Sequence, residues 1–165
     1  MSLAAIWSGP TLDLQQANWK SDLEVAELVQ RLAPRREPLD RAQALIHGFA
    51  QQAGEQKQPR LLALLAGLFT TLSAQRDSVL TGLDRFGRRQ KELAAQIRTD
   101  NEKLRTLQGN PASDANAVAQ ATQQVTWEAA LFQDRRQAIS YACDVPGKIE
   151  QRLFALAHAI QQETE

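Results

Sequence analysis

The chain has 165 residues, which is enough for one domain with a buried core. Hydrophobic residues make up 43% of it and aromatic residues 5%, and its apolar positions are mostly Leu and Ala, which favours a helical globular protein over a disordered or β-rich one. Its 19 basic and 19 acidic side chains cancel, which argues against a general attraction to nucleic acid or anionic lipid.

The first ten residues, MSLAAIWSGP, lack the cationic start and apolar core of an intact secretory signal peptide. The leading Met-Ser-Leu is either native or was added by cloning to a chain that had lost an export signal. We expect a bacterial periplasmic or cell-envelope location, with the cytoplasm as the alternative. No transmembrane segment is expected, because the densest apolar run, residues 61–69, is far shorter than the roughly 20 residues that cross a bilayer.

Residues 21–54 are predicted to form two short helices. Ser21 and Glu24 have the spacing of a capping box at the start of the first helix, and Pro34 ends it. Pro38 suits the first turn of the second helix, and Gly54 suits its C-terminal cap.

Residues 60–107 are predicted to form one long helix, because they contain no proline and carry a sustained apolar stripe. The stripe slips by one residue between Val79 and Leu83, which should disturb regular packing near Gly82 and Gly87. Its members are Leu61, Leu65, Leu68, Leu72, Val79, Leu83, Phe86, Leu93, Ile97, Leu104 and Leu107.

Residues 109–113, GNPAS, predict a turn with Ser113 as the N-cap of a second long helix that runs to about residue 143. Pro146 interrupts this helix, and a last helix follows. The short turn makes the two long helices antiparallel neighbours. We therefore predict a single all-α domain with a four-helix-type bundle head and a long antiparallel helical hairpin arm, which is coiled-coil-like. The head comprises residues 21–75 and 147–165, the arm comprises residues 76–146, and residues 1–20 form an N-terminal segment.

The returning helix, which reads TWEAALFQDRRQAISYACDV over residues 126–145, carries two apolar faces where one partner helix can cover only one. The face that meets the outgoing helix contains Val125, Phe132 and Ile139. The second face contains Trp127, Leu131, Ala138, Tyr141 and Val145. Either the N-terminal segment, with its Trp7, Leu12, Leu14 and Trp19, packs on this second face, or the face is exposed and binds another protein or a second copy of the chain.

The run DRFGRRQK, residues 84–91, is the strongest basic cluster and places Arg85, Arg88 and Arg89 at helical-neighbour spacing. These arginines are expected to be solvated or to pair within the chain. Residues 76–106 are net positive and residues 108–165 net negative, so acidic side chains of the returning helix, among them Glu128 and Asp134, offer internal partners. A protein partner is the second interpretation, and nucleic acid or anionic lipid the weakest, because the domain has no net basic charge.

The two histidines define a possible ligand pocket in the head, near His47, Phe49, Phe154 and His158. Neither histidine follows a glutamate at the spacing of a carboxylate-bridged dimetal site, and no metal or cofactor is expected. The single Cys143 has no histidine nearby in sequence, so it is interpreted as a small apolar residue and not as a nucleophile.

No catalytic motif and no resemblance to a known family stands out. The leading hypothesis is a non-enzymatic protein–protein interaction or assembly module, either with a protein partner or as a homodimer. Its contact residues would be Trp127, Leu131, Ala138 and Tyr141, with Arg85, Arg88 and Arg89. The alternative is a helical bundle that binds a small molecule or a metal in the head pocket.

Overall fold

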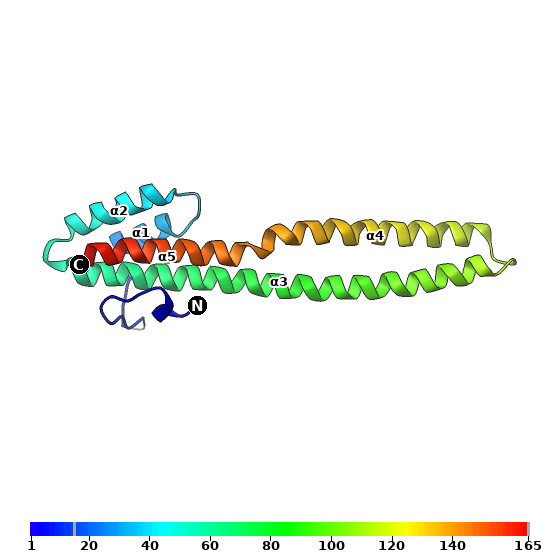
Figure 1. The fold of residues 1–165 in the computed structure, drawn as a ribbon, viewed down its shortest axis with the longest axis horizontal. Helices are drawn as coiled ribbons and strands as arrows, with labels where there is room; N and C mark the ends of the chain where they lie inside the picture. Colours follow the sequence, from blue (N-terminus) through cyan, green and yellow to red (C-terminus); the bar gives the residue numbers. More distant parts are fainter. Residues whose placement is uncertain (15, 165) are drawn as a thin grey trace. The chain divides into compact units, whose positions relative to one another are not determined.

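The structure is a computed structural model, and it describes residues 1–14 and 16–164. Within this part of the chain every regular element is helical, which confirms the predicted all-α bundle and hairpin. In chain order the elements are η1 (Leu3–Ala5), α1 (Leu23–Leu32), α2 (Leu39–Gln52), η2 (Gly54–Gln56), α3 (Lys57–Gly109), α4 (Ala115–Cys143) and α5 (Val145–Thr164) (Figure 1).

The chain divides into two compact units, and α3 contributes to both. The bundle unit consists of Met1–Val79 and Val145–Glu165, and the hairpin unit consists of Leu80–Asp144. The bundle unit contains α1, α2, α5 and the first part of α3. The hairpin unit contains the rest of α3, the turn that follows Gly109, and α4.

Two helix starts lie one residue later than the sequence predicted. Asp22, not Ser21, caps α1, because its carboxylate accepts hydrogen bonds from the amides of Glu24 and Val25. The Ser21 hydroxyl instead donates to the carbonyl of Asn18 at 2.7 Å. Asp114 likewise replaces Ser113 as the N-cap of α4. In both places an aspartate directly follows the predicted serine, and its carboxylate is an equally good acceptor for the free amides of the first turn.

The prolines and glycines mark the other helix ends close to their predicted places. The helix α1 ends at Leu32, two residues before Pro34. Gly54, directly after the C-cap of α2, has a φ of 54°, a conformation that glycine adopts without strain. The helix α3 starts three residues before its predicted start and includes Pro59, because a proline in the first turn removes an amide that has no helical partner there.

The core of the bundle unit is made of aliphatic side chains at helical spacing. Because each fully buried Leu or Ile contributes roughly 1.5–3 kcal/mol, this cluster supplies most of the unit's stability. Its largest fully buried members are Val25, Val29 and Leu32 of α1, Ile46 of α2, Leu61, Leu64, Leu65, Leu68 and Leu72 of α3, and Leu153, Leu156 and Ile160 of α5.

The N-terminal segment packs onto this same core. Trp7 is 8% exposed and belongs to the core cluster, and Leu12, Leu14 and Trp19 pack against it. Gly67 of α3 lets Trp19 approach closely, since a Cβ at this position would lie 2.9 Å from a carbon of the Trp19 ring. The large apolar side chains Trp7, Leu12, Leu14 and Trp19 of this segment are thus used within the bundle unit.

A buried arginine joins α5 to the end of α1. Arg152 is 6% exposed, and its Nε and Nη2 donate to the carbonyl of Leu32 at 2.8 and 2.6 Å, while its Nη1 donates to the carbonyl of Glu37 at 2.9 Å. Leu32 is the last residue of α1, so its carbonyl has no partner within the helix. Arg152 supplies that partner, and burial lowers the pKa of its guanidinium.

Candidate interaction surfaces of the hairpin

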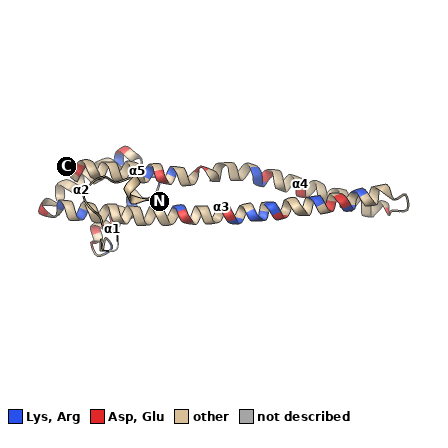
Figure 2. Ribbon diagram, turned by 60° about the horizontal axis from the view of Figure 1, so that its bottom comes forward, with Lys and Arg blue, Asp and Glu red and all other residues tan. Residues whose placement is uncertain are grey.

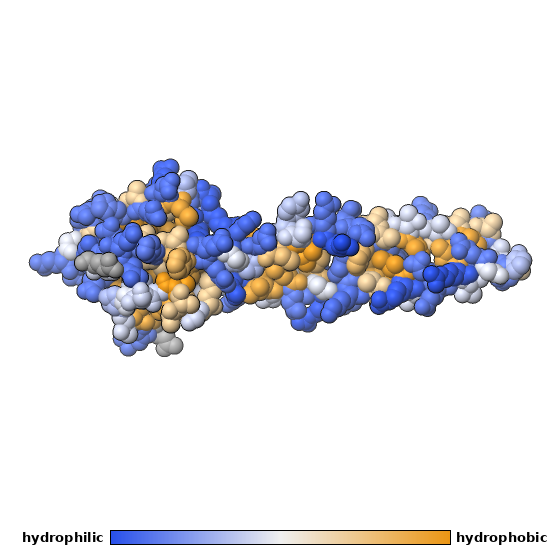
Figure 3. Space-filling model, viewed as in Figure 1, coloured by the Kyte–Doolittle hydropathy of each residue, from blue (hydrophilic) through white to orange (hydrophobic). Residues whose placement is uncertain are grey.

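Almost no side chain of the hairpin unit is completely buried. All residues of Leu80–Asp144 are described, and Glu128 alone among them is buried. The apolar side chains between its two helices, such as Phe86, Phe132 and Ile139, are half-buried. Figure 3 shows apolar residues at the surface between α3 and α4. This unit thus leaves apolar surface available for another molecule.

Four of the five residues predicted for the second face of α4 form an exposed stripe, here called the Trp127 stripe: Trp127, Leu131, Ala138 and Tyr141. The fifth, Val145, does not belong to it, because it starts α5 and packs against the core of the bundle unit. Trp127 is 59% exposed and Tyr141 73% exposed, Ala138 is exposed, and Leu131 is half-buried. At 3.6 residues per turn the four residues lie within an arc of about 80° on the helix. The first interpretation, in which the N-terminal segment covers this face, is wrong, because Trp7, Leu12, Leu14 and Trp19 pack in the bundle unit.

The predicted basic cluster lies on the exposed surface of α3, where Figure 2 shows basic and acidic residues along the helix. Arg85, Arg88 and Arg89 are all exposed. Arg88 pairs with Asp84, one turn earlier on the same helix. Over residues 1–14 and 16–164, Arg85 and Arg89 have no acidic partner within 4.0 Å. Arg85 and Arg89 are therefore solvated and Arg88 pairs within its own helix, whereas the offered pairing with Glu128 or Asp134 of the returning helix is not formed.

Glu128 is a buried carboxylate that lacks a cation. Its Oε1 accepts a hydrogen bond at 2.6 Å from the amide of Gln124, one turn earlier, whereas its Oε2 is buried and has no hydrogen-bond partner among the described residues. Across the hairpin, Gln90 Nε2 of α3 donates a hydrogen bond to the carbonyl of Phe132 of α4 at 2.8 Å.

The four residues of the predicted head pocket do not line one cavity. His47 of α2 is exposed, and its Nδ1 lies 2.7 Å from Glu163 Oε1. Phe49 is buried and lines a cleft with residues of α1 and α2. Phe154 and His158 of α5 line a different cleft, against the N-terminal segment.

The structure also places the single cysteine and the possible metal ligands. Cys143 is a free, exposed thiol at the end of α4, and not the buried apolar residue that was expected. Among the described residues no group of three or more histidine, cysteine, aspartate or glutamate side chains is placed to hold a metal ion.

A groove between α3 and α4, which the sequence did not predict, lies on the hairpin. Its volume is about 260 Å³, and its walls are largely apolar. The residues that line it are Phe86, Gly87, Gln90, Lys91 and Ala94 of α3 and Phe132, Arg136 and Ile139 of α4. The slip in the α3 stripe near Gly87 was the only signal in the sequence at this place. Which α4 residues face Gly87 depends on the register of the two helices.

Comparison of the chain with models of protein families, with curated proteins and with solved structures found no match. The fold defines an all-α protein with a helical bundle unit and an antiparallel hairpin unit. Within residues 1–14 and 16–164, no helix is both long enough and apolar enough to span a membrane. One architecture can serve many functions, so the surfaces of the hairpin indicate function better than the fold does.

Proposed function

We propose that this protein is a non-enzymatic interaction or assembly module, and that the Trp127 stripe of α4 is its main contact with a protein partner. The observation that carries the proposal is the exposure of Trp127, at 59%, and of Tyr141, at 73%, on one face of a helix. Exposed apolar surface of this kind marks interaction sites in soluble proteins. Tryptophan and tyrosine are also the residues that most often dominate binding energy at protein interfaces.

The binding energy that two exposed aromatic residues can contribute is large enough for a specific interface. A single interface hot spot contributes about 2 kcal/mol or more, so two aromatic residues on one helix face are sufficient anchors for a partner. The hairpin unit supports this proposal in a second way, because a unit without a buried apolar side chain gains stability when a partner covers its surface.

The partner is either a different protein or a second copy of the chain, and Asp134 helps to separate these two cases. At helical spacing Asp134 lies within the arc of the stripe. If two copies of α4 pack antiparallel, with Trp127 of one against Tyr141 of the other, then Asp134 meets its own counterpart at the two-fold axis. Like charges there oppose self-association in this register, so a different protein with a cation at this position is the better fit.

The proposal is tested by photocrosslinking in cells of the source organism. A photoreactive phenylalanine derivative replaces Trp127 in one variant and Gln133 in a control variant. Gln133 is also exposed on α4, but it points about 120° away from Trp127. We expect a discrete crosslinked product from position 127 that is absent from position 133. Equal products from both positions, or none from position 127, would argue against the Trp127 stripe as the contact.

A further inference from the structure

Two of the residues that line the groove between α3 and α4 are basic. Lys91 and Arg136 line the groove and are exposed. Throughout the described part of the chain, neither side chain has an acidic group within 4.0 Å. The lining also includes the apolar side chains of Phe86, Phe132 and Ile139. A ligand that fits must therefore combine an apolar part with negative charge beside it.

Gly87 keeps the groove open, although the fold itself does not require a glycine there. A glycine in the middle of a helix destabilises it relative to alanine. At Gly67 this loss of helix stability is offset by close packing. A Cβ there would lie only 2.6 Å from a methyl carbon of Val29, so a glycine is needed. At Gly87 a Cβ would meet no atom within 4 Å. The absence of a side chain at Gly87 thus leaves free space in the groove that no residue of this chain fills.

The dimensions of the groove favour side chains over a small molecule. Pockets for small molecules typically measure about 300–1,000 Å³ and enclose most of the ligand. The groove, at about 260 Å³, is smaller and open to solvent. It has room for one or two apolar side chains, which an amphipathic helix presents at three- and four-residue steps.

We propose that this groove binds an acidic amphipathic helix of a partner protein. An apolar side chain of that helix lies over Gly87 between Phe86 and Phe132, and carboxylates beside it pair with Lys91 and Arg136. Opposite charges at the rim of an interface speed association and exclude partners of the wrong charge. The groove is distinct from the Trp127 stripe, because Phe132 and Ile139 point about 130° away from Trp127 on α4.

The test begins with a displayed library of helical peptides of about five turns. Apolar residues are held at three- and four-residue steps, and the remaining positions vary among Glu, Lys, Gln and Ala. The library is selected on the full chain, and the enriched peptides are then titrated against variants by fluorescence anisotropy. Gly87→Leu fills the groove. Gly82→Leu is the matched control, because Gly82 lies in the same helix, also has no atom within 4 Å of a Cβ, and does not line the groove.

We expect the enriched peptides to carry Glu in preference to Lys and to bind less tightly as salt is raised. Gly87→Leu should weaken binding at least roughly tenfold, whereas Gly82→Leu and Trp127→Asp should bind like the original chain. Circular dichroism should show that Gly87→Leu melts at the same temperature or higher, so that loss of binding is not loss of folding. Lys91→Glu with Arg136→Glu should also abolish binding of the acidic peptides.

Three outcomes would overturn the proposal. The first is an absence of enriched peptides, or enrichment without a preference for Glu. The second is equal affinity for Gly87→Leu and Gly82→Leu. The third is binding to vesicles of phosphatidylglycerol and phosphatidylcholine that Gly87→Leu abolishes, which would assign the groove to anionic lipid. A loss of peptide binding in Trp127→Asp, with Gly87→Leu unaffected, would transfer the binding to the Trp127 stripe and leave the proposed function standing without the groove.

Discussion

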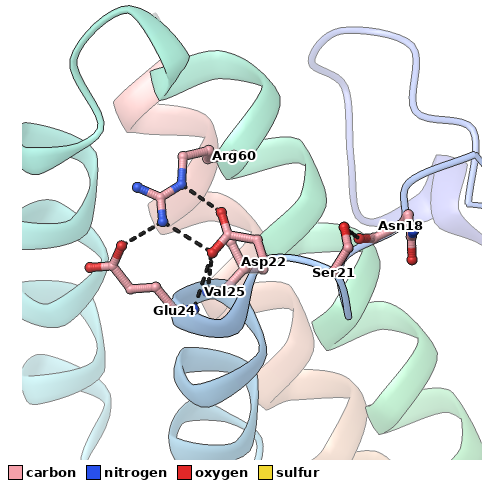
Figure 4. A network of polar contacts seen from close by, with 6 residues as sticks. All are labelled: Asn18, Ser21, Asp22, Glu24, Val25 and Arg60. Carbon is pink, nitrogen blue, oxygen red and sulfur yellow. Dashed lines mark hydrogen bonds and ion pairs between the residues drawn. The ribbon is translucent and has the colours of Figure 1, made fainter.

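Arg60 of α3 binds the carboxylate of Asp22, the residue that caps α1. Its Nε donates to Asp22 Oδ2 at 2.8 Å, and its Nη2 donates to Oδ1 at 3.2 Å (Figure 4). The same Oδ1 accepts from the amides of Glu24 and Val25. Arg60 also pairs with the Glu24 side chain. One carboxylate therefore both starts α1 and ties it to α3.

Replacing Asp22 by alanine should lower the free energy of unfolding by about 1–2 kcal/mol, because the cap and the Arg60 contact are lost together. Urea unfolding measures this change. Ser21→Ala is the matched control and should change stability by less than about 0.5 kcal/mol, since the Ser21 hydroxyl does not cap the helix. If both variants lost equal stability, the assignment of Asp22 as the cap would be wrong.

The contribution of Asp22 to stability should depend on pH. Hydrogen bonds from the Arg60 side chain, and secondarily from the amides of α1, hold the pKa of Asp22 below its ordinary value of 3.8, although desolvation opposes this shift. Because the pKa is lower in the folded state than in the unfolded state, the stabilisation is complete above the unfolded pKa and is lost as the pH falls through the folded pKa. The difference in unfolding free energy between the original chain and Asp22→Asn should thus be constant near neutrality and shrink below pH 3.8. If this difference in unfolding free energy grew as the pH fell, the prediction would be contradicted.

Arg152→Leu should destabilise the bundle unit by about 3 kcal/mol, because it leaves the carbonyls of Leu32 and Glu37 without their buried donor. The stability of Arg152→Lys should fall between that of the original chain and that of the leucine variant, since an ammonium group cannot reproduce the planar donor pattern of the guanidinium. Thermal melting followed by circular dichroism ranks the three proteins. A leucine variant as stable as the original chain would show that Arg152 is dispensable for capping α1.

Glu128→Leu should stabilise the hairpin unit by about 1 kcal/mol. The substitution removes a buried carboxylate whose Oε2 has no partner among the described residues, and it places apolar volume between the two helices. Hydrogen exchange of the α4 amides should slow in this variant and stay unchanged in Glu102→Leu, a control at an exposed position of α3. Faster exchange in Glu128→Leu would mean that the carboxylate makes a stabilising contact.

The arrangement of helices was predictable because local signals act within a few residues. Pro34 and Gly54 follow helix ends, Pro146 lies in the first turn of α5, and apolar steps of three and four mark helices. The exact caps were not predictable where a serine and an aspartate are adjacent, as at Ser21 and Asp22, because either side chain can accept from the first turn.

The surfaces were less predictable, because they depend on which segments meet. Where residues 1–20 pack could not be decided from their composition, since Trp7 fits any apolar surface. The groove at Gly87 could not be predicted, because its walls depend on the register of α3 against α4. Arg152 and Glu128 carried a weak signal: each charged residue interrupts the buried side of its helix at helical spacing, as Arg152 does between Ile149 and Leu156.

The most direct measurement of the central claim is the affinity of the partner that crosslinks at position 127 for three purified proteins. These are the original chain, Trp127→Asp, and the control Gln133→Asp. We predict that Trp127→Asp binds at least roughly tenfold more weakly, because it places a charge at an interface hot spot, and that Gln133→Asp binds as the original chain does. Equal affinity of the partner for all three proteins would contradict the proposal that the Trp127 stripe is the interaction surface.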